Sequence, residues 1–177
     1  HVRSRRQRQM CIRDRACGLA DLGKPDGYVA RQIKGWSERY DNARTPDAPG
    51  WQEVRTWLEE KMPADHPRPA IVHNDYRFDN VILDANDPLR IIGVLDWELT
   101  TLGDPLMDLG NTLAYWIEAD DPAPVQLMRR QPSNAPGMLT RQAFVDYYAE
   151  RAGIEIKCFD FYYIYGPVSY THLTLPT

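Results

Sequence analysis

The chain has few cysteines, no long apolar run and only a small net charge. Three cysteines in 177 residues are too few for a disulfide framework, and nothing at the start reads as a secretory signal, so we expect a cytoplasmic protein. No apolar run approaches the ~18 residues of a membrane span, so no membrane partner is expected. The formal charge of −4 gives no argument for a nucleic-acid partner. The chain is 43% hydrophobic, which is enough for a core and excludes a wholly disordered chain.

The two ends differ in composition from the rest of the chain. Residues 1–15 carry six arginines and one acid. Residues 167–177 can be back-translated into a DNA segment whose reverse complement encodes residues 5–15, and this DNA resembles a sequencing-library adapter. We therefore expect residues 1–15 and 167–177 to be translated adapter rather than native protein, with residues 16–166 as a native body truncated at both ends. That body is acidic, which again argues against nucleic acid.

Hydrophobic spacing predicts a mainly helical body with a small group of strands in the middle. Short apolar runs at 70–73, 81–83 and 91–95 predict one strand followed by a small hairpin. Residues 118–139 are rich in Asp, Pro and Gly and predict a loop. Helical spacing is found over residues 26–44, 51–62, 104–116 and 140–148, and an aromatic segment at 159–165 predicts the start of one more helix. The expected fold class is α+β, mainly helical.

Polar residues that can carry chemistry stand between the predicted strands. His73, Asp75 and Asn80 form the pattern H-x-D-x4-N, and Asp96 follows at the end of a later strand. Phosphoryl transfer needs such a set: one carboxylate to orient an attacking hydroxyl and accept its proton, and an amide oxygen and a second carboxylate to hold Mg²⁺ against nucleotide phosphates. The pattern therefore favours a kinase-type site.

Two longer segments carry a family resemblance. The stretches HNDYRFDNVILD and GVLDWELTTLGDPLMDLG occur in this order, separated by a short turn. Together they resemble the C-terminal lobe of the aminoglycoside phosphotransferase and choline-kinase-like family, and within it most closely the phosphotransferases associated with acyl-CoA dehydrogenases. The resemblance implies the large lobe of a protein-kinase-like fold over residues 16–166, with a β-hairpin carrying the catalytic loop and the metal-binding aspartate.

The resemblance also implies roles for single residues. Asp75 matches the catalytic-loop base, and His73 matches the histidine that opens the loop and positions it. Asn80 and Asp96 match the Mg²⁺ ligands that hold ATP.

Two further aspartates and one departure from the family pattern complete the assignment. Asp104 precedes Pro105 and is expected to cap the following helix. Together with Asp108, it is expected to support the site structurally. Asn74 stands where aminoglycoside enzymes usually have glycine, and this difference argues against an antibiotic acceptor.

The sequence contains no recognisable segment that would bind the nucleotide phosphates. No lysine lies in a V-A-I-K-like strand, and no G-x4-G-K-[ST] loop is present, which excludes a P-loop enzyme. We expect an ATP- and Mg²⁺-dependent kinase acting on a small-molecule hydroxyl, inactive as this fragment alone, with a fused or associated acyl-CoA dehydrogenase. The alternatives are a Mg²⁺-dependent phosphoester hydrolase and a non-catalytic kinase-like binding module.

Overall fold

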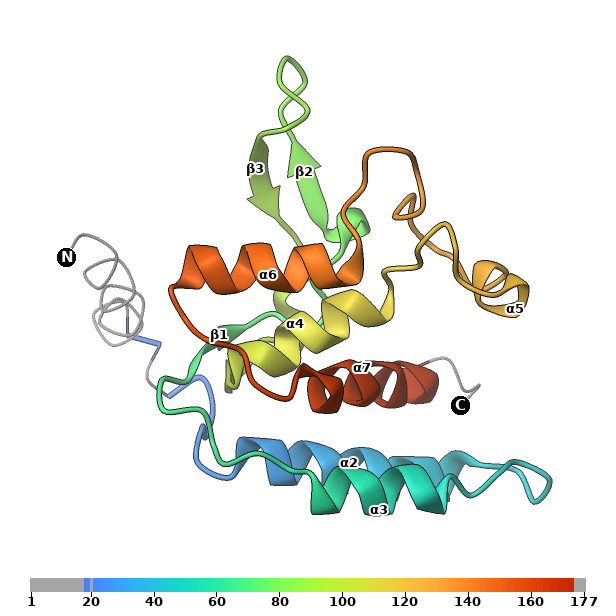
Figure 1. Cartoon of the computed structure of the whole chain (residues 1–177). Helices are drawn as coiled ribbons and strands as arrows, with labels where there is room; N and C mark the ends of the chain where they lie inside the picture. Colours follow the sequence, from blue (N-terminus) through green and yellow to red (C-terminus); the bar gives the residue numbers. More distant parts are fainter. Residues whose placement is uncertain (1–17, 20, 174–177) are drawn as a thin grey trace.

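A computed structural model describes residues 18–19 and 21–173 of the chain (Figure 1). The prediction that residues 1–15 are adapter-derived lies outside the described residues, and so does the part of the C-terminal prediction that covers residues 174–177. Residues 167–173 continue the last helix. Among the described residues, no helix is both long enough and apolar enough to cross a membrane.

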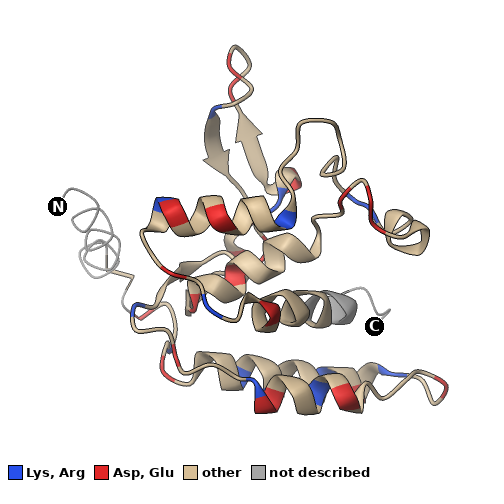
Figure 2. Cartoon of the chain, in the orientation of Figure 1, with Lys and Arg blue, Asp and Glu red and all other residues tan. Residues whose placement is uncertain are grey.

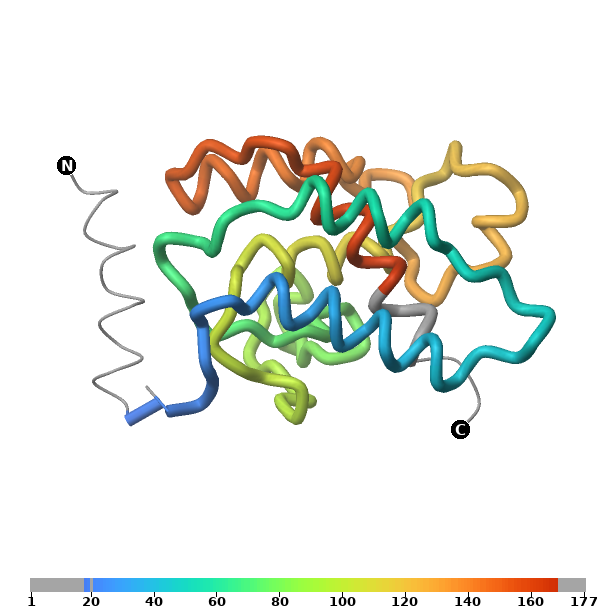
Figure 3. The backbone as a smooth tube through the Cα atoms, turned by 90° about the horizontal axis from the view of Figure 1, so that it is seen from below, coloured from blue at the N-terminus to red at the C-terminus, as the bar shows by residue number. Residues whose placement is uncertain are grey.

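The two N-terminal helices pack as a pair. They are α2 (Tyr28–Ala43) and α3 (Gln52–Glu60), as the spacing of apolar residues predicts. Both are amphipathic, and they lie side by side along one edge of the molecule (Figures 1 and 3). Arg55 of α3 makes a two-pronged ion pair with Asp41 of α2, with N–O distances of 2.7 and 2.8 Å. This ion pair holds the two helices together on their exposed side.

The centre of the body is built from α4 and α7. Helix α4 (Pro105–Ala114) packs lengthwise on α7 (Phe159–Leu173), and their backbones touch. A Cβ atom at Gly110 would lie 2.3 Å from the carbonyl oxygen of Tyr162, so only glycine allows this approach. The largest fully buried side chains of the core lie on and around these helices: Val29, Leu58, Val72, Met107, Leu113 and Phe161.

Two further helices complete the helical layer. Helix α6 (Arg141–Ala152) is capped by Thr140, whose hydroxyl accepts a hydrogen bond from the Ala143 N–H. The region predicted to be a loop contains only the four-residue helix α5 (Ala123–Gln126). The expectation of a mainly helical α+β fold is confirmed.

Two small antiparallel sheets hold the segments that contain the candidate site residues. The predicted hairpin is present: β2 (Val81–Leu83) pairs with β3 (Ile91–Val94). Strand β1 (Ala70–Val72) pairs with β4 (Thr101–Gly103), a strand that was not predicted from the sequence. Strand β4 is only Thr-Leu-Gly, which is too short to show strand periodicity. Its pairing with β1 places the segment before His73 beside the segment before Asp104.

The β2–β3 hairpin projects from the body and exposes apolar side chains (Figure 1). Its strands carry no Lys, Arg, Asp or Glu, and the charged residues lie in the turn between them (Figure 2). The exposed large apolar residues of this region are Ile82, Leu83, Leu89, Ile91 and Ile92.

Candidate active site

His73 is a buried positioning group in this structure. Its Nδ1 accepts a hydrogen bond from the Asp75 N–H (3.2 Å), and its Nε2 lies 2.7 Å from the carbonyl oxygen of Leu95. Because an N–H faces Nδ1 and a carbonyl faces Nε2, the ring carries its proton on Nε2. Trp97 covers the ring at a centroid distance of 4.8 Å. Both ring nitrogens therefore help to hold residues 73–80, called the catalytic loop below after the role proposed for it, to the end of β3.

Asn74 occupies a left-handed backbone position. Its φ is +66°, a region that glycine enters freely and that asparagine tolerates better than most residues. The need for this conformation explains why asparagine can replace the family glycine. The side chain adds two bonds: its Nδ2 donates to the Leu99 carbonyl (2.9 Å), and its Oδ1 accepts from the Tyr28 hydroxyl (3.1 Å). Burial raises the pKa of Tyr28 to about 12, so this hydroxyl stays protonated and donates.

Asp75 and Asn80 lie in direct contact. The short 3₁₀ helix η1 (Phe78–Asn80) turns the loop back on itself. As a result, the Asn80 Nδ2 donates both to the Asp75 carbonyl (2.8 Å) and to the Asp75 Oδ2 (2.9 Å). The other carboxylate oxygen of Asp75, Oδ1, is buried and has no hydrogen-bond partner in the described structure. Burying a carboxylate oxygen without a hydrogen-bond donor costs free energy, unless a ligand supplies the donor.

Asp96 lies where β3 ends, close to the catalytic loop. The preceding residue, Leu95, donates its N–H to the Asn80 carbonyl (2.8 Å) and accepts from His73, so it ties β3 to both ends of the loop. Asp96 itself has a φ of +63° and precedes the 3₁₀ helix η2 (Trp97–Leu99), which its side chain does not cap. Asp96 is exposed, so its carboxylate is accessible to a ligand.

Asp108 and Asp104 support the site from α4. Both Asp108 oxygens accept backbone N–H groups of the catalytic loop, from His73 (2.9 Å) and Asn74 (2.7 Å). Asp104 caps α4 by accepting from the Leu106 N–H (2.8 Å), as predicted, and its other oxygen accepts from the Tyr162 hydroxyl (3.2 Å). Asp108 thus holds the loop directly, whereas Asp104 joins α4 to α7.

The pKa of Asp104 should make stability depend on pH. Burial raises this pKa above its ordinary value, against the lowering effect of the Leu106 N–H. A carboxyl group with a raised pKa stabilises the folded state fully below its unfolded-state pKa, and this contribution is lost as pH rises through the folded-state pKa. We expect the free energy of unfolding of the wild-type chain, relative to Asp104→Asn, to fall as pH rises above about 4, with a slope of at most about 1.4 kcal/mol per pH unit.

Urea denaturation of the two chains at several pH values measures this difference. Asparagine is also a good helix cap, so the variant keeps the cap and loses the titration, while the Tyr162 hydroxyl must then accept from the new NH₂ group instead of donating; that exchange adds an offset that does not depend on pH. The exposed helix residue Asp146, changed to asparagine, is the control for the loss of one surface carboxylate. A difference between wild type and Asp104→Asn that stays constant from about pH 4 to about pH 7 would contradict the prediction.

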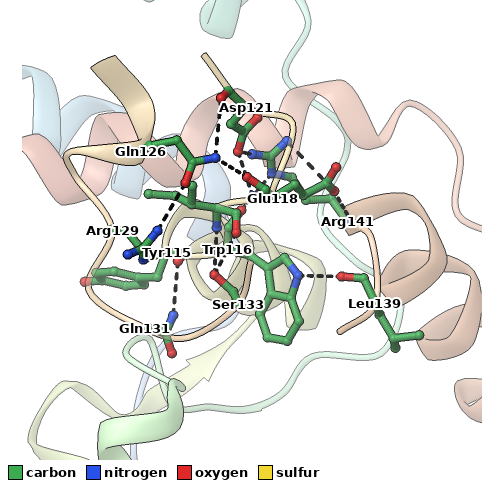
Figure 4. Close-up of polar contacts among 11 residues, drawn as sticks. Tyr115, Trp116, Glu118, Asp121, Gln126, Arg129, Gln131, Ser133, Leu139 and Arg141 are labelled. Atoms are coloured by element: carbon green, nitrogen blue, oxygen red, sulfur yellow. Dashed lines mark hydrogen bonds and ion pairs between the residues drawn. The ribbon is translucent and has the colours of Figure 1, made fainter. Parts of the chain in front are cut away.

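The segment between α4 and α6 braces the catalytic loop from the other side (Figure 4). Gln131 is buried; its Oε1 accepts from the Phe78 N–H (2.9 Å) and its Nε2 donates to the Tyr115 carbonyl (3.2 Å). Arg141 fastens the same segment through ion pairs with Glu118 and Asp121. The role of Gln131 was not predicted from the sequence, because this residue lies in an irregular segment 53 residues from its partner in the catalytic loop.

The oxygen ligands available here fit Mg²⁺. The described residues contain no group of three or more His, Cys, Asp or Glu that could hold a metal ion. Asn80 and Asp96 together offer an amide and one carboxylate, and Mg²⁺ is commonly bound by one or two carboxylates, with water and substrate phosphates completing its shell. Because the Asn80 Nδ2 faces Asp75, its amide oxygen is turned away from that carboxylate.

A cavity of about 500 Å³ opens beside the catalytic loop. Asn74 lines it from the loop, together with residues of α2, α4 and α7. Three of its lining residues are cationic, namely Lys24, Arg31 and Arg39, and no aspartate or glutamate is among the described lining residues. The charged residues that line this cavity are therefore positive, although the chain as a whole has a net negative charge.

Comparisons with known proteins assign the class. Among solved structures, the chain is similar to a protein from Ralstonia eutropha named as an aminoglycoside phosphotransferase, with a TM-score of 0.75 and 30% identity over 93% of this chain and 50% of that one. The fold is thus that of a kinase-like phosphotransferase. A model of the phosphotransferase enzyme family matches residues 9–144, and the chain belongs to this family.

Curated relatives carry acyl-CoA dehydrogenase names. The chain is 38% identical over 103 residues to acyl-CoA dehydrogenase family member 11 of Gallus gallus, covering 58% of this chain and 13% of that protein. It is 33% identical over 140 residues to family member 10 of Mus musculus, covering 78% and 13%. It is 30% identical over 152 residues to the acyl-CoA dehydrogenase IBR3 of Arabidopsis thaliana, covering 78% and 18%. The chain therefore spans less than a fifth of these relatives.

Proposed function

We propose that this domain belongs to an ATP- and Mg²⁺-dependent kinase that phosphorylates the hydroxyl of a small molecule. The observation that carries the proposal is the state of Asp75: one oxygen is fixed by Asn80, while the other is buried and unpartnered. Such an oxygen can accept the proton of a bound hydroxyl as that hydroxyl attacks the γ-phosphate. His73 holds the loop in this conformation and does not itself exchange protons.

Asn80 and Asp96 would hold the magnesium ion in this proposal. When bound, the ion would supply positive charge that stabilises the nucleotide phosphates during transfer. The chain's own contribution is geometric, since the Leu95 N–H bond to the Asn80 carbonyl keeps the loop and the end of β3 together. We further propose that the chain corresponds to the large lobe of a protein-kinase-like fold.

The cationic lining of the cavity favours an anionic acceptor. Lys24, Arg31 and Arg39 would attract a carboxylate or phosphate group and repel a polycationic aminoglycoside. A hydroxy acid meets this requirement through its carboxylate, and its coenzyme A thioester meets it through the phosphates of the coenzyme; both are consistent with the dehydrogenase names of the relatives. We accordingly propose a cytoplasmic enzyme in which this domain is fused to, or associated with, an acyl-CoA dehydrogenase.

The 177-residue chain alone should have little kinase activity. None of the described strands β1 to β4 contains a lysine, and a strand lysine is the group that grips ATP phosphates in kinases. The decisive assay therefore uses the enzyme expressed from the complete reading frame that contains this chain, called the full-length enzyme below.

Transfer of labelled γ-phosphate from ATP tests the function. The full-length enzyme is incubated with Mg·ATP and either a hydroxy acid, its thioester or an aminoglycoside. We expect labelled product from one of the anionic acceptors, none from the aminoglycoside, and none after chelation of Mg²⁺.

Two other outcomes would replace the proposal. Mg²⁺-dependent release of phosphate from a phosphoester without nucleotide would indicate a hydrolase. Binding of Mg·ATP by calorimetry, without transfer to any hydroxyl, would indicate a kinase-like binding module.

A further inference from the structure

Every polar atom of Asp75 except one is held in place. Its N–H donates to His73, and its carbonyl and Oδ2 both accept from the Asn80 side chain. The residue as a whole is 8% exposed, and within the described structure Oδ1 is buried without a partner. The two oxygens of one carboxylate therefore have different environments, and the orientation of the group decides which one meets a ligand.

Arg77 lies against the fixed oxygen. Its Nε is 3.3 Å from the Asp75 Oδ2, in an ion pair, and among the described residues the same Nε is buried without a hydrogen-bond partner. A second nitrogen of the guanidinium, Nη1, is 3.7 Å from the Asp79 Oδ2. Only 28% of the Arg77 side chain is exposed, so the ion pair with Asp75 is partly shielded from solvent.

The position of Arg77 is set by Tyr115. The guanidinium carbon lies 5.2 Å from the centre of the Tyr115 ring, within the range of a cation–π contact. The Tyr115 carbonyl accepts from Gln131 (Figure 4). The Gln131 Oε1 in turn accepts from the Phe78 N–H of the catalytic loop. These contacts thus connect Arg77, through Tyr115 and Gln131, to the next residue of the same loop.

We propose that Arg77 is a positioning residue that holds Oδ2 of Asp75, so that Oδ1 is the oxygen that receives the acceptor's proton. This inference rests on the proposed kinase function. In the reaction, the hydroxyl oxygen of the acceptor bonds to the γ-phosphorus, the bond from that phosphorus to the bridging oxygen breaks, ADP leaves, and the hydroxyl proton passes to Oδ1. Arg77 acts on this step only through the orientation of the carboxylate.

Replacing Arg77 with methionine tests the proposal, because methionine keeps an unbranched stem over Tyr115 and removes the charge. In the full-length enzyme we expect kcat to fall about 10- to 100-fold, as for a misplaced catalytic group, with the KM for ATP unchanged within about twofold. Arg77→Lys should recover part of the loss. Arg151→Met is the matched control, since Arg151 also stacks on a tyrosine (5.3 Å from the Tyr147 ring) but lies on α6.

A crystal structure of the Arg77→Met enzyme gives a readout that does not depend on activity. We expect the Asp75 carboxylate to rotate and Oδ2 to lose its bond to Asn80. An unchanged carboxylate orientation would overturn the inference, as would an unchanged kcat, or a raised KM for ATP with kcat intact, which would make Arg77 a nucleotide-binding group. If the methionine variant does not fold, Arg77→Gln is judged by the same criteria.

Failure of the inference and failure of the proposed function give different results. A wild-type enzyme that transfers no phosphate to any acceptor contradicts the kinase function, and the carboxylate orientation in the variant crystal still decides the role of Arg77. An active wild type with an equally active Arg77→Met variant contradicts the inference alone.

Discussion

Asp75→Asn in the full-length enzyme should lower kcat by a factor of about 10² to 10⁴, the usual contribution of a general base. Asparagine has nearly the same shape and can still accept from Asn80 through its amide oxygen, but its other end is an NH₂ group that cannot take a proton. The binding of Mg·ATP, measured by calorimetry, should be unchanged, because Asn80 and Asp96 rather than Asp75 are the proposed metal ligands.

The control for this experiment is Asp87→Asn at the tip of the β2–β3 hairpin. Asp87 also accepts a backbone N–H, from Leu89 (3.2 Å), but it is exposed and outside the site. Its variant should keep wild-type turnover. Retention of full turnover by Asp75→Asn would remove Asp75 from the mechanism, whereas loss of nucleotide binding would assign it to the metal site.

Asp108→Ala should be the most destabilising single substitution near the site. It leaves the buried N–H groups of His73 and Asn74 without an acceptor, at about 1–3 kcal/mol each. Burial raises the pKa of Asp108, so removing this carboxylate also relieves part of its own desolvation. We expect a net loss of about 2–4 kcal/mol in the free energy of unfolding, a large share of the ~5–15 kcal/mol typical of a domain.

Urea denaturation of the 177-residue chain measures this loss. Asp146→Ala on α6 provides the comparison, because that aspartate is exposed and accepts a hydrogen bond from the Gln142 side chain in its own helix (2.9 Å). It should change stability by less than about 0.5 kcal/mol. A loss below ~1 kcal/mol for Asp108→Ala would show that the loop keeps its conformation without the two hydrogen bonds.

The parts of the fold that local spacing can specify were predicted well. Helix α2 and the β2–β3 hairpin follow from apolar periodicity within each segment, and the cap at Asp104 follows from the adjacent proline. The contact between Asp75 and Asn80 was also predictable, because the two residues are five positions apart and one short turn brings them together.

The supporting contacts of the site could not be predicted in the same way. Tyr28 reaches Asn74 across 46 residues, and Gln131 reaches Phe78 across 53. Neither partner has a local pattern that distinguishes it from an ordinary helix tyrosine or loop glutamine. Such contacts arise only once α2 and the segment after α4 have packed against the loop, so they depend on the tertiary fold rather than on neighbouring residues.

The left-handed backbone at Asn74 changes how related sequences should be compared. What the site requires at this place is a torsion angle, and glycine and asparagine both meet it at low cost. The sequences H-G-D and H-N-D are therefore both compatible with this loop conformation. A search pattern that insists on glycine would discard chains whose loop reaches this conformation with asparagine. Asn74 by itself therefore does not argue against an antibiotic acceptor, contrary to the expectation from the sequence.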